Sequence, residues 1–509
     1  MRVANYLEEK GEITNQDGLL LPGTSEFLRQ SPMKNFIAGR WSDAQGGQPY
    51  KVIDPSTGSV LTTISLGTSA DVDAAVKAAQ KAFPGWAGKS PTERSVLLHR
   101  LADALEKKQG ELSQIEALDV GKAVVNAEAF DIPFGVACIR YFADLAVNSQ
   151  YSVPLAIRNM EARVYRAPYG VCGFIFPWNF PFDLLMWGIM PALAAGNTVV
   201  VKPSEITPLS TLFVCRVAEE IGFPEGVLNV VLGDGAGVGK ALANHPDIQR
   251  MSFTGSPATG KQIAEACARN LIPCKLELGG KGAAVIFDDI DLDATAKQLA
   301  SAITLNTGQV CCTATRWIIH ESIFDKFVTR ASEALEQTAI GPALDRNTQM
   351  GPLASEVHRN RVLGYLEKGE SEGAKFLLKG TDFVVPGASG GYYMAPSLMS
   401  GSNENICCRE EIFGPVAYLL KFQDEGEAVS MVNELRYGLA NSVWSGDLSR
   451  ANRVAEKMVA GNSWINAHNV FAYGLPYGGV NLSGFGGGVN SPETFFDYLR
   501  NQTIARPLA

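Results

Sequence analysis

The chain has 509 residues, which is too long for one ordinary hydrophobic core and predicts two or three domains. Its 46% hydrophobic and 19% charged residues are typical of a soluble globular protein. The net charge of −9, without basic runs between aromatic residues, argues against nucleic acid as a partner, and no apolar stretch is long enough to span a membrane.

Nine cysteines without a CxxC pair predict reduced thiols and a cytoplasmic protein rather than a disulfide framework. Five scattered histidines argue against a zinc site, so no metal is expected. The first thirty residues include Glu8, Glu9 and Lys10 and lack a continuous apolar core. That composition argues against a secretory signal and against a mitochondrial transit peptide.

The N-terminal part of the chain predicts an extension followed by helices. Residues 1–34, which contain scattered glycine and proline, are interpreted as loosely held. Residues 70–83 and 92–109 carry alanine and leucine at helical spacing and predict amphipathic helices.

Strand and helix patterns then alternate along the chain. Alternation of this kind predicts a doubly wound parallel sheet, which binds ligands outside the carboxyl ends of its strands. The first set of strands is predicted at residues 170–176, 198–202, 227–232 and 250–253. A second α/β domain is predicted from about Ala283 to about Phe422, with strands at 283–287, 317–320, 375–378 and 416–422.

Two segments outside both alternations predict additional strands. Residues 152–165 alternate polar and apolar side chains and predict a hairpin, and the tail 491–507 ends in a strand-like run. We expect them to pair with each other or with another subunit.

The stretch NTGQVCCTATR contains Cys311 and Cys312 side by side. Either both are buried core thiols, or one is a nucleophile and the other its packing neighbour. A nucleophilic thiolate needs a lowered pKa or a nearby base. No histidine is close in sequence, which argues against a cysteine–histidine protease.

Two motifs could assist such a thiol. Glu277 in LELGGKG is flanked by leucines; burial would raise its pKa and suit it to general-base work, although a lone glutamate there could also be a surface group. Asn179 in FPWNFP lies between prolines that fix the backbone. Its amide could donate to an oxyanion or simply build a turn.

Two more motifs predict contacts to a nucleotide. FTGSPATGKQ matches the GxxxxGK loop of nucleoside triphosphatases from Gly255 to Lys261, but Gln262 replaces the serine or threonine that holds magnesium. VKPSE places Lys202 and Glu205 at a strand end, where they could bind ribose hydroxyls or form an ordinary surface pair.

Together these segments resemble the aldehyde dehydrogenase superfamily, in its NAD(P)-dependent, non-acylating form. FPWNFP, KPSE, FTGS, LELGGK, GQVC and EEIFGPV occur in the family's order, and the resemblance extends from NFIAGRW at Asn35 to the tail. It implies a Rossmann-like doubly wound cofactor domain, a second α/β catalytic domain and a small β oligomerisation element. The expected partners are a small aldehyde and further copies of the chain, as a homodimer or homotetramer.

The resemblance implies the roles of the reacting groups. Cys311 matches the nucleophile, Glu277 the general base, and Asn179 the oxyanion donor together with the backbone N–H of Cys311. The implied reaction oxidises an aldehyde to the carboxylic acid and transfers hydride to NAD. A thiohemiacetal on Cys311 becomes a thioester, which water activated by Glu277 then hydrolyses.

The same resemblance implies the cofactor contacts. Lys202 and Glu205 match contacts to the adenosine ribose, and Glu205 favours NAD over NADP because it would repel a 2′-phosphate. Glu411 matches a contact to the nicotinamide ribose, with Phe413 beside the ring and Trp178 also in the cofactor site.

The loop that resembles a triphosphatase has a different implied use. Gly255, Ser256 and Gly260 match a turn whose amides and helix dipole face the pyrophosphate. Such a turn holds no magnesium, so it needs no serine or threonine at position 262, and Gln262 is compatible with it. In a triphosphatase, by contrast, Gln262 would remove the magnesium-binding hydroxyl.

The resemblance also implies a substrate tunnel lined by Phe180, Asp183, Leu184, Trp187, Val310, Phe471 and Tyr477. Its aromatic residues could form an apolar wall or bind a quaternary ammonium through cation–π contacts. Asp183 stands where the family often has an apolar residue, which favours a cationic substrate such as betaine aldehyde or an aminoaldehyde.

The expected domain boundaries are 1–34 for the extension, 35–150 with 169–279 for the NAD-binding domain, 280–482 for the catalytic domain, and 151–168 with 483–509 for the oligomerisation strands. Three departures from the family stand near the end of the chain: Asn481 replaces a common lysine, and Gly487 and Gly488 replace a common Arg–Glu pair. The lost pair puts local packing or subunit contacts in doubt.

Three alternatives remain open. A CoA-acylating member would generally lack Glu277, a catalytically silent homologue would be expected to lose Cys311 or Glu277, and a P-loop ATPase would need a magnesium-binding hydroxyl near Lys261.

Overall fold

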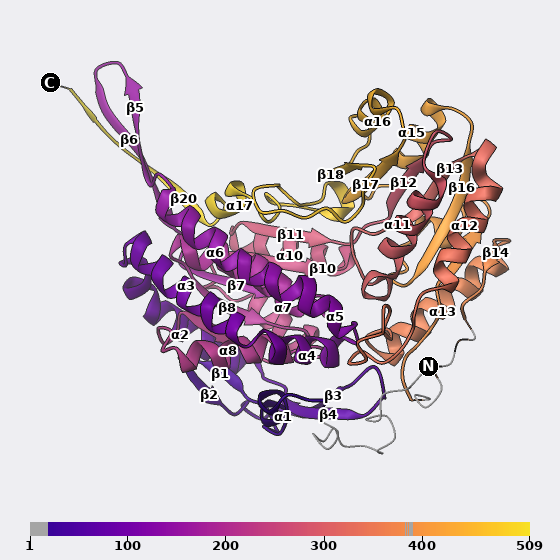
Figure 1. The fold of residues 1–509 in the computed structure, drawn as a ribbon. Helices are drawn as coiled ribbons and strands as arrows, with labels where there is room; N and C mark the ends of the chain where they lie inside the picture. Colours follow the sequence, from indigo (N-terminus) through magenta and orange to yellow (C-terminus); the bar gives the residue numbers. More distant parts are fainter. Residues whose placement is uncertain (1–18, 382, 384, 386–389, 509) are drawn as a thin grey trace.

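The computed structural model describes residues 19–381, 383, 385 and 390–508. These residues form two large sheets with helices on both faces, and a small three-stranded sheet that projects from the body (Figure 1). The predicted doubly wound α/β architecture is therefore present twice. No helix among the described residues is long and apolar enough to cross a membrane.

The first large sheet has eight strands in the order β19–β11–β10–β7–β8–β9–β1–β2. Its five central strands are parallel, and β8 and β9 lie on one side of β7 while β10 and β11 lie on the other. The strand order therefore reverses between β7 and β10, which is where such sheets bind ligands. The strands are β1 Asn35–Ile37, β2 Arg40–Ser42, β7 Val171–Ile175, β8 Thr198–Lys202, β9 Leu228–Val230, β10 Arg250–Gly255, β11 Cys274–Leu278 and β19 Gly484–Phe485.

Helices cover both faces of this sheet, and successive side chains of a strand point to opposite faces. Cys172 and Phe174 face one helical layer, whereas Val171 and Ile175 face the other. The first layer comprises α3 Pro91–Lys107, α4 Gln109–Val120, α6 Ile132–Asn148, α7 Pro181–Ala195 and α8 Leu209–Glu220. The second comprises α2 Ser69–Ala87, α9 Lys240–Ala243 and α10 Pro257–Asn270.

The second large sheet has seven strands in the order β14–β15–β16–β13–β12–β17–β18, and only β14 runs antiparallel. Its strands are β12 Gly282–Ile286, β13 Ala314–His320, β14 Lys375–Leu378, β15 Ser397–Ser400, β16 Val416–Phe422, β17 Ala440–Trp444 and β18 Asn462–Ile465. Helices α11 Leu292–Thr304 and α12 Phe324–Glu336 cover one face. Helices α13 Glu356–Ser371, α14 Ile406–Arg409, α15 Glu425–Asn433 and α16 Leu448–Ala455 cover the other.

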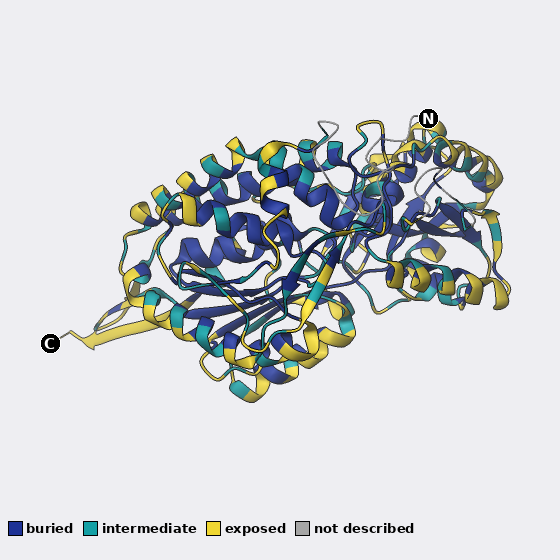
Figure 2. Cartoon of the chain, turned by 90° about the horizontal axis from the view of Figure 1, so that it is seen from below, coloured by how far each residue is buried: buried dark blue, intermediate teal, exposed yellow. Residues whose placement is uncertain are grey.

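The predicted hairpin and tail pair with each other. Strand β6 (Met160–Pro168) lies between β5 (Ser152–Ile157) and β20 (Leu499–Pro507), and all contacts are antiparallel. Figure 2 shows β20 as almost wholly exposed beyond its first residue. A separate two-stranded ribbon is formed by β3 Pro49–Ile53 and β4 Val60–Ser65.

Three expectations from the sequence were wrong. The part of the extension that the structure describes is not loosely held: Pro22–Leu28 forms helix α1, and Leu20, Phe27 and Leu28 are buried in the main core. The first eighteen residues lie outside the described part. The second alternation does not end near Phe422, because β17, α16 and β18 continue the same sheet.

The third correction concerns the tail. Residues 483–509 do not all belong to the projecting sheet, since β19 pairs with β11 at the edge of the first large sheet. Between β19 and β20 the chain forms helix α17, Pro492–Phe496. The glycines that precede this helix allow the chain to lie directly against β11, where a side chain on Gly484 would collide with the carbonyl of Leu276.

Candidate active site

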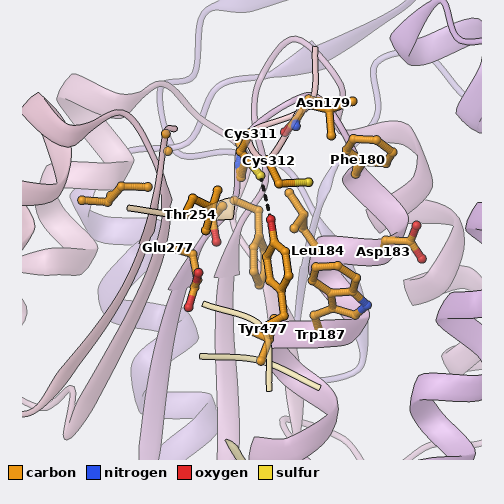
Figure 3. Close-up of a pocket in the computed structure, with 18 of the residues that line it drawn as sticks. Asn179, Phe180, Asp183, Leu184, Trp187, Thr254, Glu277, Cys311, Cys312 and Tyr477 are labelled. Carbon is orange, nitrogen blue, oxygen red and sulfur yellow. Dashed lines mark hydrogen bonds between the residues drawn. The ribbon is translucent and has the colours of Figure 1, made fainter. Parts of the chain in front are cut away.

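A cavity of about 400 Å³ lies at the carboxyl ends of β7 and β10, next to the loop that precedes β13. It is lined by Asn179, Glu277 and Cys311 together, although these residues come from distant parts of the chain (Figure 3). The switch point of the first sheet therefore opens on the groups that the sequence singled out for chemistry.

Cys311 lies in the turn between the 3₁₀ segment Leu305–Gly308 and β13. Its Sγ is 3.4 Å from the hydroxyl of Tyr477 (Figure 3). Hydrogen bonds from the Cys312 thiol and then from Tyr477 lower the pKa of Cys311, although burial opposes them. The backbone before the turn is held in the left-handed region at Asn306 and Thr307, so the thiol is presented by a firmly shaped loop.

The surroundings of Cys312 disfavour a reactive thiolate. It is buried, its Sγ donates to Asn469 Oδ1 at 3.4 Å, and its pKa is raised well above the ordinary value by its hydrogen bond to Cys311 and by burial. All nine cysteines are free, so the adjacent pair forms no disulfide. The geometry favours one reactive thiol and one packing neighbour.

Asn179 is buried, and its amide nitrogen donates to the carbonyl of Gln309 at 3.1 Å. The side chain of Asn306 donates in turn to the carbonyl of Asn179 at 2.8 Å. These two bonds fix the amide against the loop that carries Cys311 and leave its second N–H for an oxygen bound at the thiol. The arrangement suits an oxyanion donor.

Glu277 stands near the end of β11 and is 9% exposed. Burial raises the pKa of its carboxyl, the Lys275 ammonium lowers it, and the charge of Cys311 raises it further. No hydrogen-bond partner of Oε2 is found among the described residues. This oxygen is therefore available to take a proton from water.

The expected cofactor residues gather at the same edge of the sheet. Lys202, the last residue of β8, contacts Glu205 at 2.9 Å. Ser256 caps α10 by accepting from the N–H of Thr259 at 3.3 Å. A Cβ on Gly260 would lie 2.7 Å from the Leu278 side chain, so only glycine lets α10 begin this close to β11.

Glu411 and Phe413 close the other side of the cavity. Oε1 of Glu411 accepts from the N–H of Gly280 at 2.9 Å, and burial raises its pKa to about 7. Phe413 has a φ of 65°, and its ring packs edge-on against Trp178 with the centroids 5.4 Å apart. His358 Nε2 lies 2.7 Å from the Phe413 carbonyl and supports this conformation.

These residues fit a dinucleotide. The first turn of α10 presents its backbone N–H groups beside Gly255, where a Cβ would lie 2.5 Å from the Phe253 ring, so no side chain can intrude on the turn. Lys202 and Glu205 offer a donor and an acceptor for a ribose, and Glu411 offers a second acceptor on the opposite wall. Lys202, Glu205 and Gly260 do not line the cavity itself, whereas the other expected cofactor residues do.

All seven expected tunnel residues line the cavity, and most are aromatic or apolar. Tyr477 lies 5.4 Å from Phe471 and 5.7 Å from Trp187, measured between ring centroids. Phe130, which sequence reasoning missed, extends this wall at 6.0 Å from Phe471. It comes from a segment with no recognisable motif, so no pattern in the sequence could have indicated it.

Asp183, on which the cationic-substrate hypothesis rests, lies in the wall of the cavity. Its carboxyl is buried and points away from Cys311 and Tyr477 (Figure 3). Burial, and then the neighbouring charge of Asp131, raise its pKa well above the ordinary value. Lys122, which lies 2.8 Å from Asp131, already supplies the positive charge in this cluster. Burial therefore favours the neutral form of Asp183. The hypothesis of a cationic substrate drawn from this residue stays a prediction.

A doubly wound sheet that opens on an activated thiol, a buried carboxylate and a fixed amide defines a dinucleotide-dependent oxidoreductase working through a covalent thiol adduct. The chain belongs to the aldehyde dehydrogenase family, whose model matches residues 41–504. It is 38% identical to 2-aminomuconic semialdehyde dehydrogenase of Bos taurus, over 93% of this chain and 98% of that protein.

Solved structures agree with the family. PnpE from Pseudomonas sp. WBC-3 is 39% identical, with a TM-score of 0.91, over 94% of this chain and 98% of that one. Betaine aldehyde dehydrogenase from Staphylococcus aureus, in complex with NAD⁺, is 32% identical, with a TM-score of 0.91, over 96% and 97%. The protein is accordingly an NAD-dependent enzyme that oxidises aldehydes to carboxylic acids.

Proposed function

We propose that Cys311, Asn179 and Glu277 divide the reaction between them. Cys311 attacks the aldehyde carbon as a thiolate, and Asn179 with the N–H of Cys311 stabilises the oxyanion. NAD, when bound, accepts the hydride that leaves this carbon. Glu277 then takes a proton from the water that attacks the thioester, which releases the acid and restores the thiol. The contact that supports this division is the 3.4 Å hydrogen bond that holds Cys311 Sγ at the cavity wall beside Glu277 and Asn179.

Water is the proposed acceptor of the acyl group, rather than CoA. Glu277 is present, buried and without a partner for Oε2 among the described residues, as a base for water requires. Substituting Glu277→Gln is expected to allow one round of hydride transfer and then stop at the thioester. Rapid mixing with an aldehyde and NAD, followed by intact-mass measurement, tests this. A variant that turns over at the normal rate would contradict it.

We also propose that the natural substrate is an uncharged aldehyde with an aromatic or apolar substituent. The tunnel wall consists largely of Phe130, Trp187, Phe471 and Tyr477, and burial raises the pKa of its acid, Asp183, well above the ordinary value. An isolated charge entering this wall would lose its hydration with no buried counter-charge free to replace it.

A matched pair of aldehydes tests the substrate class. Trimethylammonioacetaldehyde and 3,3-dimethylbutanal have nearly the same shape and differ in one charge, and succinic semialdehyde adds an anion. We expect kcat/KM to be at least about tenfold higher for the neutral compound, because each 1.4 kcal/mol of desolvation costs a factor of ten. A preference for the cation would instead favour the aromatic wall as a cation–π site.

The variant Asp183→Asn separates the two views of this residue. An amide has the shape of the neutral carboxyl that burial favours, so kcat/KM for both aldehydes is expected to change by less than about threefold. If the charge of Asp183 recruited cations, only the rate with the trimethylammonium compound would fall.

Assembly belongs to the same proposal. The sheet β5–β6–β20 projects from the body and exposes Leu155, Ile157 and Ile504. An exposed sheet with apolar side chains fits contact with a second copy of the chain, so we propose a homo-oligomer built through it.

A further inference from the structure

The three consecutive glycines Gly486–Gly488 have a structural reason. All three have positive φ, at 104°, 90° and 65°. A Cβ on Gly487 would lie 2.2 Å from Asp497 Oδ2, and a Cβ on Gly488 would lie 2.5 Å from the carbonyl of Tyr477. The loop is thus pressed between two parts of the chain, and the Arg–Glu pair common in the family could not occupy it.

The space beside this loop is taken by a buried lysine. The Nζ of Lys275 makes a short hydrogen bond to the carbonyl of Gly488 and lies 3.5 Å from Asp497 Oδ2. Its side chain is 1% exposed and lies over the ring of Tyr498. Arg250 approaches the same oxygen of Asp497 at 3.4 Å. Lys275 is therefore anchored from several directions.

Lys275 and Glu277 share one face of β11. They are two residues apart, and the intervening Leu276 packs against the helical layer on the opposite face. Both residues line the active-site cavity. Strand β11 contains one lysine and one acidic residue, and these two side chains are neighbours on the same face.

We propose that Lys275 is a positioning residue for the general base: its anchored ammonium group supplies the positive charge that favours the ionised form of buried Glu277 in the hydrolysis step. The proposal rests on the role of Glu277 proposed above. It gives the glycine loop a function, because the Gly488 carbonyl and Asp497 are the groups that keep the ammonium in place.

The chemistry of the step requires such a charge. Water adds to the thioester carbon while its proton passes to the Glu277 carboxylate, and the carbon–sulfur bond then breaks to release the acid and the Cys311 thiolate. Burial disfavours the carboxylate and is the main cause that raises the pKa of Glu277 to about 8. The Cys311 sulfur carries the acyl group at this step and adds no charge. The Lys275 ammonium opposes the effect of burial on Glu277. Burial lowers the pKa of Lys275 itself to about 8, and the charged groups that face its ammonium are Asp497, Arg250 and Glu277.

The experiment measures the burst of NADH, which reports hydride transfer, and the steady-state rate, which includes hydrolysis, in the variant Lys275→Met. Lys275→Arg is the conservative variant, and Lys297→Met, at an exposed lysine, is the control. We expect Lys275→Met to keep the first burst of NADH but accumulate the acyl-enzyme. Its kcat should fall about tenfold at neutral pH and the acidic limb of its pH profile should move up by about 1 pH unit, since an opposite charge nearby shifts a carboxyl by that order. Lys275→Arg should restore the normal limb.

Several outcomes would overturn the proposal. Deacylation of Lys275→Met with an unchanged pH profile is one. Another is a joint fall of the burst and steady-state rates, as a merely structural role would predict. If Lys275→Met does not fold, the variant Asp497→Asn is used in its place. It removes a negative charge that holds the Lys275 ammonium, so the alkaline limb of the kcat profile should move to lower pH. An unchanged alkaline limb overturns the proposal.

Glu277→Gln distinguishes this failure from that of the proposed function. If Glu277→Gln deacylates normally, the base has been misassigned. If Glu277→Gln accumulates acyl-enzyme and Lys275→Met does not, only the role of Lys275 is wrong.

Discussion

Cys311 and Cys312 are neighbours in the chain, yet their thiols have opposite surroundings. Hydrogen bonds from Cys312 and Tyr477 lower the pKa of Cys311, whereas burial and the same contact with Cys311 raise that of Cys312. The motif GQVC already indicated which one to choose. The contact with Tyr477 could not be predicted, because it joins residues 166 positions apart.

The two cysteines should therefore respond differently to substitution. Cys311→Ala removes the only proposed nucleophile and is expected to lower NADH formation by at least about 10⁴-fold, which is the scale of losing a covalent catalyst. Cys312→Ala should keep the rate within about fivefold, since a small buried methyl replaces a thiol that takes no part. Steady-state assays on both variants, with folding checked by circular dichroism, measure this.

Tyr477→Phe tests the hydroxyl without changing the tunnel wall. The hydrogen bond from Tyr477 favours the thiolate, so its loss raises the pKa of Cys311 and reduces the thiolate fraction at neutral pH. Alkylation by iodoacetamide at pH 7 should slow by roughly three- to tenfold, the worth of one hydrogen bond. The rate well above the thiol pKa should be unchanged; a uniform slowing at every pH would point to blocked access instead.

At the scale of elements, the sequence predicted the strands whose apolar or alternating pattern is uninterrupted. The runs that became β7 and β8 are continuously apolar. Strand β17 was missed because Asn441 and Ser442 interrupt its apolar pattern, and β19 because two residues carry no pattern at all. Lys275 was a signal that could have been used, since a lysine within a buried strand requires a partner.

Helix α1 is the element whose importance the sequence concealed. Phe27 is 1% exposed and packs edge-on against Phe213 of α8, with the centroids 5.2 Å apart. Phe27→Ala is expected to lower the free energy of unfolding by about 3–5 kcal/mol, because it leaves a cavity in the main core. Thermal denaturation should show a lower Tm. Val357→Ala, at a site 81% exposed, is the control and should leave the Tm unchanged.

At the scale of the whole molecule, the two large sheets meet at one cavity while the third sheet stands apart (Figure 1). The fold class was predicted from the sequence, and the structure confirms it. Of the two pairings that the sequence left open for the hairpin and the tail, the structure shows the one with each other. How many copies assemble could not be predicted, because that depends on the shape of the exposed surface rather than on any pattern along the chain.

Charging the projecting sheet should break the oligomer. Ile157 and Ile504 are 46% and 55% exposed, so replacing both with aspartate costs the folded chain little but places like charges in the proposed contact. Sedimentation velocity should show a smaller species than the unmodified protein. If the particle size is unchanged, this sheet is not the site of association.

The pairing of β20 with β6 also sets an order of events during synthesis. Leu499–Pro507 lies opposite Met160–Pro168 in nine consecutive pairs, so β6 leaves the ribosome more than 300 residues before its partner. Until then β6 can pair only with β5 on one side, and its other edge stays open to neighbouring nascent chains. Strand β19 likewise completes the edge of the cofactor-binding sheet from late in the chain. The projecting sheet is therefore completed only after the strands of both large sheets have been synthesised. A ribosome that stalls before Leu499 would release a chain in which one edge of β6 is unpaired and open to aggregation.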